Sequence, residues 1–378
     1  MAYYFTLPKF TDLTEDQEMA LGEINAIAIS GGAGTGKTVV SILRHLELME
    51  NKNKYSVLVT YTKTLKFYIE MTIQSIENKN TLNTNVLPPS KQIFNLQDFP
   101  FNENWRVYEI IIDEAQDLYY NTHLDIKNYA EQISYGADFN QQLYSGRIIE
   151  DEIEQLHNNV PCNLQQNFRN TYHILNFVKY ILPNFYIPQH TIDELEYENI
   201  GFKPIFFITN NSFNKEIEKI IELINEFESN THNIAILLPF GDSRYDFEQS
   251  VDRYYNELLI RGINCSKYYN AMNTNNIYID NIHITTFKSS KGLEFDTVII
   301  PQLHKMKNNI KNTYTVNQED YYVAFTRTKK NLYLLSSDKL EFVDNNICDI
   351  ELLNNSHYNK PKKEVSVFRD MNTDEILF

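Results

Sequence analysis

Glycine is scarce in this chain, and much of it lies in one short stretch. Only 11 of the 378 residues are glycine, well under half of the usual share of about 7 %. Four of these glycines fall within residues 31–38, which read GGAGTGKT. This concentration points to a segment whose backbone N–H groups must turn toward a ligand.

Cysteine and long apolar runs are also rare. Cys162, Cys265 and Cys348 are isolated in the sequence, which excludes a disulfide scaffold and a zinc site built from cysteine pairs, and suits a reducing compartment. Apolar runs such as 234–239 are far too short to span a bilayer, and no charged-then-apolar leader opens the sequence. We therefore expect a cytoplasmic protein with no membrane partner.

Basic residues are outnumbered, with 34 Lys and Arg against 50 Asp and Glu and a net charge of −16. This balance argues against a protein that coats nucleic acid non-specifically, although a local basic groove is compatible with it. Hydrophobic residues make up 42 % and charged residues 22 %, close to globular averages. The length predicts two or three folded domains.

The glycine-rich stretch matches the pattern G-x-x-x-x-G-K-[ST]. Glycines allow the backbone to wrap around phosphate oxygens, the lysine reaches the β- and γ-phosphates, and the threonine hydroxyl binds Mg²⁺. The apolar run 26–30 before it is typical of a buried parallel strand, and 39–49 has helical apolar spacing. A plain glycine-rich turn is the alternative, and the flanking strand and helix disfavour it. The predicted nucleotide contacts are Gly31, Gly32, Ala33, Gly34, Thr35, Gly36, Lys37 and Thr38.

A second apolar run, 107–112, leads into DEAQD at 113–117. Asp113, at the end of this expected strand, can hold Mg²⁺ through water together with Thr38, and Glu114 can accept a proton from an attacking water. Taken alone, these carboxylates could simply favour a helix N-terminus. The phosphate loop earlier in the chain favours the catalytic interpretation.

Together with other motifs, these two segments make the sequence resemble the UvrD/Rep branch of the superfamily 1 helicases. The motifs follow one another along the chain in the family's order. They are LTEDQ (13–17), the phosphate loop, VLVTYTK (57–63), DEAQD (113–117), SYGADFNQQLY (134–144), LQQNFR (164–169), TTFKSSKGLEF (285–295) and YVAFTR (322–327). The resemblance implies an α/β fold of two tandem RecA-like domains with mainly parallel sheets and ATP in the cleft between them.

The resemblance also implies roles at the nucleotide. Gln17 would read adenine, Gln141 would sense the γ-phosphate, and Arg169 and Arg327 would act as arginine fingers from the second domain. Gly292 would let the backbone approach the nucleotide, with Glu294 near the ribose. The catalytic set implied in this way is Lys37, Asp113, Glu114, Gln141, Arg169 and Arg327.

A further set of residues is expected to touch a single strand through aromatic, hydroxyl and lysine side chains. These are Thr60, Tyr61, Thr62, Lys63, Tyr144, Thr286 and Lys288. Tyr61 and Tyr144 could equally pack in the core of a chain with 26 tyrosines. Lys288 stands where the family usually has histidine; lysine binds phosphate but lacks the hydrogen-bond geometry of imidazole.

Alternating apolar and helical segments predict the α/β class and its domains. The expected strands are 26–30, 56–61, 92–96, 107–112, 132–135, 204–208, 233–238, 282–287, 297–301 and 332–336, with helices at 214–228 and 245–261. The expected divisions are 1–158, an N-terminal ATP-binding domain; 159–340, a C-terminal domain; and 341–378, a tail or docking segment.

Several other segments are expected to be structural. Large helicases of this branch carry an inserted subdomain in each domain, and residues 63–113 and 169–285 leave little room for them. The first insertion is expected to be missing, and the second to be missing or reduced to about 184–203. The acidic run 150–154 is interpreted as a solvated helix face and 193–198 as a surface loop. Residues 305–311, with Lys329 and Lys330, form either a basic rim or a loop.

These patterns predict an ATP-dependent translocase or helicase on single-stranded DNA that uses Mg²⁺, moves 3′ to 5′ by resemblance, and relies on a protein partner for unwinding. Two alternatives remain open. One is an ATP-gated switch that regulates a partner protein without movement, and the other is a motor that acts on RNA.

Overall fold

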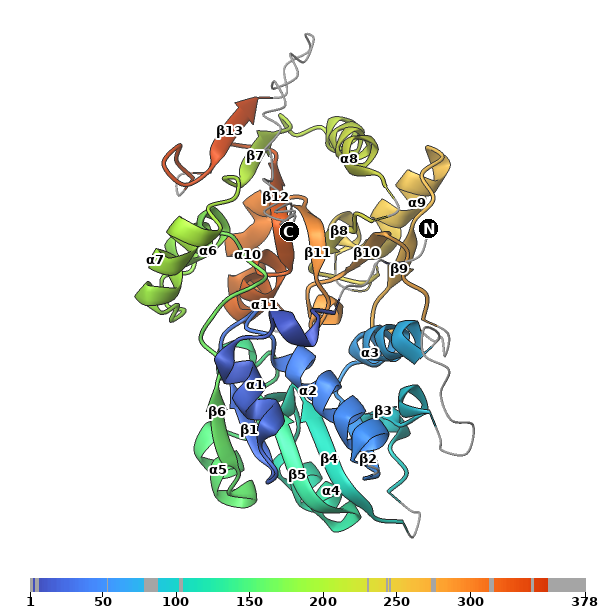
Figure 1. The fold of residues 1–378 in the computed structure, drawn as a ribbon. Helices are drawn as coiled ribbons and strands as arrows, with labels where there is room; N and C mark the ends of the chain where they lie inside the picture. The colour runs from blue at the N-terminus through green and yellow to red at the C-terminus, as the bar shows by residue number, and fades with distance from the viewer. Residues whose placement is uncertain are drawn as a thin grey trace, which may run out of the picture.

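The computed structural model describes residues 3, 7–52, 54–77, 88–101, 105–229, 231–242, 244, 246–272, 277–312, 316–340 and 343–352. They form two α/β domains, one above the other in Figure 1. None of the helices within these ranges is long and apolar enough to cross a membrane.

The first domain is built on a six-stranded parallel sheet in the order β3-β2-β4-β5-β1-β6. Its strands are β1 (Ile27–Ser30), β2 (Ser56–Thr60), β3 (Ile93–Asn95), β4 (Val107–Asp113), β5 (Ala130–Gly136) and β6 (Val160–Asn163). The helices are α1 (Glu15–Gly22), α2 (Lys37–Leu46), α3 (Lys63–Glu77), α4 (Tyr120–Ile126) and α5 (Glu150–His157). Apolar residues of α2 and α3 cover one face of this sheet, and those of α4 and α5 cover the other. Burial on both faces explains the run of three isoleucines, 110–112, within β4.

The second domain has a seven-stranded parallel sheet in the order β13-β7-β12-β11-β8-β10-β9. Its strands are β7 (Ile205–Ile208), β8 (Ile234–Leu238), β9 (Ser266–Tyr268), β10 (Ile282–Thr286), β11 (Phe295–Ile300), β12 (Thr328–Ser336) and β13 (Asp349–Leu352). The helices are α6 (Tyr172–Ile181), α7 (Gln189–Glu198), α8 (Phe213–Phe227), α9 (Val251–Ile260), α10 (Met306–Asn312) and α11 (Gln318–Phe325). The fold class is therefore α/β with two tandem parallel sheets of the RecA-like kind, as predicted.

The local sequence explains where α8 begins and which face it buries. The Ser212 hydroxyl accepts a hydrogen bond from the Lys215 N–H and caps the helix. Ile217, Ile220 and Ile224 then recur at helical spacing and are buried against the sheet. The same spacing had predicted a helix over 214–228.

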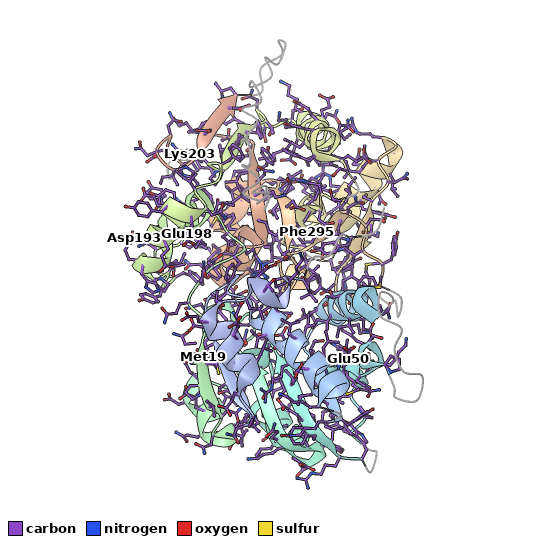
Figure 2. The ribbon with its side chains drawn as sticks, viewed as in Figure 1. Met19, Glu50, Asp193, Glu198, Lys203 and Phe295 are labelled. Carbon is purple, nitrogen blue, oxygen red and sulfur yellow. The ribbon has the colours of Figure 1, made fainter. Side chains whose placement is uncertain are left out.

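One expected loop is a helix. Residues 193–198 belong to α7, whose outer side carries exposed carboxylates while Ile192 and Leu195 pack into the second domain. Figure 2 shows Asp193 and Glu198 at the outer surface of the molecule, and Phe295 in its interior. The expectation of a loop was wrong because the charged residues masked an apolar pair at helical spacing. The acidic run 150–154 does form the exposed side of α5.

The structure also changes the limits of other segments. Strand β13 joins the second sheet beside β7, so residues assigned to the tail continue this domain to Leu352. The remainder of the tail lies outside the described residues. In the segment expected to be a basic rim or a loop, residues 306–311 belong to α10 and are not a loop. Lys305 pairs with Asp246 and Glu248, Lys329 with Glu294, and Lys330 with Asp296.

Candidate functional site: an interdomain nucleotide cleft

The phosphate loop joins β1 to α2 at the carboxyl edge of the first sheet. Gly34 and Gly36 have positive φ angles of 81° and 91°, a conformation that side chains other than glycine rarely adopt. Glycine is also required for space, because a Cβ on Gly34 would lie 2.7 Å from the Cβ of Arg169, and one on Gly36 would lie 2.5 Å from Nε2 of Gln17. The phosphate loop therefore packs closely against two other motifs, LTEDQ (13–17) and LQQNFR (164–169), which are far from it in the sequence.

Lys37 begins α2 and lies folded against the loop. Its Nζ donates hydrogen bonds to the carbonyl oxygens of Gly31 and Gly32, both at 2.8 Å, and lies 3.8 Å from Asp138 Oδ2. Burial lowers the pKa of Lys37, while the charge of Asp138 opposes that effect. The ammonium is therefore held where a phosphate oxygen could replace the loop carbonyls.

The other residues of the loop divide between two faces. Gly34, Gly36, Lys37 and Thr38 line the cleft, whereas Gly31, Gly32, Ala33 and Thr35 line a groove on the opposite face of the loop. Gln17 forms a capping box with Thr14: its side-chain oxygen accepts from the Thr14 N–H, and its own N–H donates to the Thr14 hydroxyl. Its Nε2 also donates to the Thr35 carbonyl of the loop. The amide therefore faces the end of the cleft that Leu7 and Pro8 also line.

The acidic residues follow β4 directly. The Thr38 hydroxyl donates to Asp113 Oδ2 at 2.8 Å, so a hydroxyl oxygen and a carboxylate oxygen lie side by side. This donor set fits Mg²⁺, which binds one or two protein oxygens and completes its shell with water and phosphate oxygens. Within the described residues, no group of three or more His, Cys, Asp or Glu side chains could hold a metal ion without such help. Burial and the charge of Glu114 raise the pKa of Asp113 to about 7.

Glu114 differs from Asp113 in its backbone conformation and in the direction of its pKa shift. Its backbone is left-handed, with φ of 59°, and its Oε2 accepts a hydrogen bond from Gln116 Nε2 at 2.6 Å. Burial would raise its pKa, but the charges of Lys291 and Lys37 and this hydrogen bond lower the pKa to about 2. Glu114 is therefore an ionised hydrogen-bond acceptor at the cleft.

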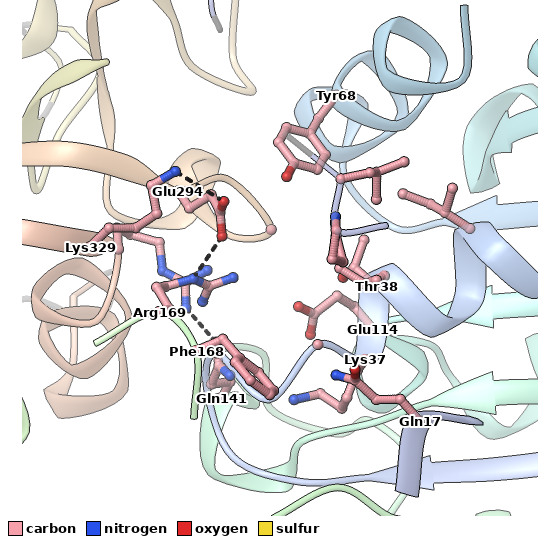
Figure 3. Close-up of a pocket in the computed structure, with 18 of the residues that line it drawn as sticks. Gln17, Lys37, Thr38, Tyr68, Glu114, Gln141, Phe168, Arg169, Glu294 and Lys329 are labelled. Carbon is pink, nitrogen blue, oxygen red and sulfur yellow. Dashed lines mark hydrogen bonds and ion pairs between the residues drawn. The ribbon is translucent and has the colours of Figure 1, made fainter. Parts of the chain in front are cut away.

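The second domain faces these groups with cations. Arg169 Nε lies 3.2 Å from Glu294 Oε2, and Lys329 Nζ lies 3.4 Å from Glu294 Oε1. The buried Arg327 donates to Gln141 Oε1 at 2.9 Å. Figure 3 shows Glu294, Arg169 and Lys329 on one side of the cleft and Gln17, Lys37 and Thr38 on the other. Gly292 lies at the rim, where its positive φ of 84° lets it pack against Leu65 of the first domain.

The residues expected to touch a strand are only partly at the surface. Thr60, Thr62 and Thr286 are buried, and their hydroxyls bind groups of the chain itself. Lys63 begins α3 and is half-buried. The rings of Tyr61 and Tyr144 lie 5.0 Å apart beside Lys288.

Three residues were missed by sequence reasoning. Phe168 is half exposed and lines the cleft beside Arg169. Arg147 stacks on Tyr119 at 3.5 Å and donates to the Tyr61 hydroxyl, while its Nε and Nη1 have no hydrogen-bond partner within the described residues. The position of Phe168 inside LQQNFR was the available signal for it, whereas Arg147 follows a motif and carried none.

Lys291 is the third missed residue, although it stands inside the KGLEF segment. Only 1 % of its side chain is exposed. It crosses from the second domain to bind Asp117 Oδ2 at 2.7 Å and the Gln141 carbonyl at 2.6 Å, and it lies 3.3 Å from Glu114 Oε2. Burial opposes its charge, but Asp117 and Glu114 raise the pKa of Lys291.

Comparisons with known proteins find similarity to helicases. A family described as the UvrD-like helicase C-terminal domain matches residues 257–339, and one described as the Schlafen group 3 DNA/RNA helicase domain matches residues 25–199. The chain is 25 % identical over 252 residues to a putative ATP-dependent DNA helicase of Acanthamoeba polyphaga mimivirus, covering 60 % of this chain and 34 % of that protein.

Two further similarities cover different shares of the chain. It is 45 % identical over 56 residues to the RecBCD enzyme subunit RecB of Chlamydia pneumoniae, which is 15 % of this chain and 5 % of that protein. The chain thus spans about a third or less of the length of the curated relatives that it matches. A crystal structure of an arterivirus nonstructural protein 10 helicase aligns with a TM-score of 0.43 and 15 % identity, over 85 % of this chain and 61 % of that one.

Proposed function

We propose that this chain, whose matching families and viral relative are described as helicases, is a superfamily 1 helicase that acts as an ATP-dependent translocase or helicase on single-stranded DNA. The observation that carries the proposal is the cleft between the domains. It brings Lys37, Thr38 and Glu114 of one domain opposite Arg169 and Arg327. Closure and opening of such a cleft can convert ATP turnover into movement.

The roles of the residues follow from their positions. Lys37 would exchange the carbonyls of Gly31 and Gly32 for the β- and γ-phosphates. Glu114 would hold the attacking water as a hydrogen-bond acceptor, and Gln141 would align it. Thr38 and Asp113 would hold Mg²⁺, which would neutralise charge on the phosphates when bound.

Cations of the second domain complete the site. Arg169 would leave Glu294 for the more highly charged γ-phosphate, and Arg327 would stabilise the same group. An arginine supplied in this way contributes about 10³–10⁵ in rate to comparable phosphoryl transfers. Because these arginines lie across the cleft from Lys37, hydrolysis would require both domains to be in contact.

The strand is proposed to run over the face that carries Tyr61, Tyr144 and Lys288. Arg147 lies among three tyrosine rings beside this face, but its Nε and Nη1 are buried and its Nη2 is bound to the Tyr61 hydroxyl, so the aromatic rings and the partly exposed Lys288 carry the assignment. Aromatic faces stack on bases, and such cations bind phosphate. Direction of movement, proposed as 3′ to 5′, rests on the family alone.

RNA remains the second candidate substrate, because one of the matching families is described as a DNA/RNA helicase domain. A protein partner for unwinding is proposed from the chain's short connections. Only 29 residues, 78–106, separate α3 from β4, which leaves little length for an inserted subdomain.

Steady-state ATP hydrolysis with and without matched single-stranded DNA and RNA tests this proposal. Glu114→Gln serves as the blank, and Glu150→Gln, which removes an exposed carboxylate of α5, is the matched control. We expect stimulation by strands that Glu114→Gln abolishes and Glu150→Gln retains. Hydrolysis that ignores both nucleic acids would overturn the motor and favour an ATP-gated switch.

A further inference from the structure

Lys288 lies where the two domains meet, at the start of the short helix Lys288–Ser290. Its ammonium is 5.7 Å from the centre of the Tyr144 ring in the first domain and 3.9 Å from Asp320 Oδ2 in the second. About 31 % of its side chain is exposed. Lys288 is therefore open to an anion from solvent while it is held by a partner inside the protein.

That partner is an unusual carboxylate. Asp320 is only 1 % exposed. Its Oδ2 accepts a hydrogen bond from the Asn317 N–H at 2.9 Å, but its Oδ1 has no hydrogen-bond partner within the described residues. A buried carboxylate with a free oxygen is destabilised unless a cation is nearby. Burial raises the pKa of Asp320 to about 6, and Lys288 is the foremost charge opposing that rise.

Asp320 is connected to the nucleotide cleft by a single short helix. It belongs to the first turn of α11 and completes the capping box with Asn317. Just beyond the other end of α11, Arg327 donates from Nε to the Val323 carbonyl and from Nη2 to Gln141. Tyr321 packs on Phe287, the residue before Lys288, with ring centres 4.9 Å apart. A shift of α11 at Asp320 would therefore move the arginine that faces the γ-phosphate.

We propose that the Lys288–Asp320 ion pair restrains hydrolysis in the strand-free protein and that a strand phosphate releases the restraint by binding Lys288. At 3.9 Å the pair is longer than a charge-assisted hydrogen bond, which measures about 2.7–2.9 Å. A phosphate at the exposed side of Lys288 can therefore draw the ammonium away. Asp320 then loses its nearest cation and α11 resettles with Arg327. Asp320 is a positioning residue in this scheme, which rests on the proposed function.

Two variants break the pair from opposite sides. Asp320→Asn keeps the size and an oxygen for the Asn317 N–H but removes the charge, and Lys288→Gln removes the cation. Both should raise strand-free hydrolysis, by roughly two- to fivefold for an ion pair of this strength. Their effects on the strand should be opposite: the half-saturating concentration of single-stranded DNA falls in Asp320→Asn, because Lys288 is freed, and rises in Lys288→Gln.

Glu319→Gln is the matched control, because it removes a carboxylate from the same turn of α11 that forms no ion pair with Lys288. It should behave as the wild-type protein. Damage to α11 alone would lower hydrolysis in every condition and could not tighten strand binding, which distinguishes it from the effect expected of Asp320→Asn. If Asp320→Asn folds poorly, Lys288→Gln, which lies outside α11, still tests the restraint through its strand-free rate.

The outcomes separate this inference from the proposed function. A wild-type protein that strands do not stimulate overturns both. A wild-type protein that strands stimulate, with both variants keeping its strand-free rate and its ratio of stimulated to strand-free rate, overturns the restraint alone. Raised strand-free rates with opposite shifts in half-saturation support it.

Discussion

Replacing Lys291 by methionine tests the contact that joins the domains beneath the cleft. The substitution keeps a long apolar stem but removes the ammonium that lies 2.7 Å from Asp117 Oδ2. Asp117 is fully buried, and its Oδ1 already has no hydrogen-bond partner within the described residues. The variant would therefore leave a buried carboxylate without its cation.

The expected loss follows from that geometry. Removing one partner of a buried ion pair destabilises proteins by about 3–5 kcal/mol, because the other charge stays buried and uncompensated. Burial already raises the pKa of Asp117 to about 6 in the presence of Lys291, so protonation of the carboxylate would relieve part of the loss. We expect about 3 kcal/mol near neutral pH, which lowers the urea midpoint by roughly 1 M for a domain of this size.

Urea unfolding followed by far-ultraviolet circular dichroism measures this loss. Lys291→Met with Asp117→Asn removes both charges and should recover most of the stability. Lys330→Met removes a lysine that is 61 % exposed and 3.0 Å from Asp296, and should cost less than about 1 kcal/mol. If Lys291→Met unfolds at the wild-type midpoint, or if the double variant is no more stable than the single one, the buried pair does not have the energetic role assigned to it.

Two further changes have definite expected results. Gly34→Ala should lower the free energy of unfolding by about 1–3 kcal/mol, because the φ of Gly34 is positive and the added Cβ would meet Arg169. Gly32→Ala is the control, since a Cβ there meets nothing within 4 Å, and it should change thermal stability little. Equal losses in the two variants would contradict this reasoning. His123 is buried against His157, and burial lowers its pKa from 6.5 to about 4. Because the folded pKa lies below the unfolded value, stability present above pH 6.5 should be lost as pH falls toward 4, on the order of 3 kcal/mol. Urea unfolding from pH 7 to pH 4 should show that slope in the wild-type protein and a shallower one in His123→Gln.

Most interior strands could be predicted because they contain an apolar run that is buried on both faces, such as 110–112 in β4 and 234–238 in β8. The strands that were missed, β6, β9 and β13, all lie at the edges of their sheets. They have three or four residues each and include polar side chains or proline. An edge strand needs only one neighbour and tolerates proline, so its sequence carries little apolar signal.

The candidate site shows the same division between local and long-range information. The phosphate loop and DEAQD are contiguous segments, so their chemistry can be predicted from the residues in order. The partners of Lys288 and Lys291 cannot be predicted in this way, because Asp320 and Asp117 are brought to them by the packing of α11 and by contact between the domains. Likewise, Thr60 and Thr62 were expected at the strand surface, and only the fold shows that their hydroxyls bind the chain itself.

The sole tryptophan of the sequence lies in a position that gives it a spectroscopic use. Trp105 precedes β4, at the amino edge of the first sheet, while the nucleotide groups of that sheet follow the carboxyl ends of its strands. It packs against Phe99 and Tyr129, and its indole N–H donates to the Pro100 carbonyl. Its fluorescence, excited where tyrosine does not absorb, therefore reports the melting of the first domain alone. Because Trp105 is not among the residues that line the cleft, we expect ligands there to leave this signal unchanged, so it can follow the integrity of the first domain during ATP hydrolysis.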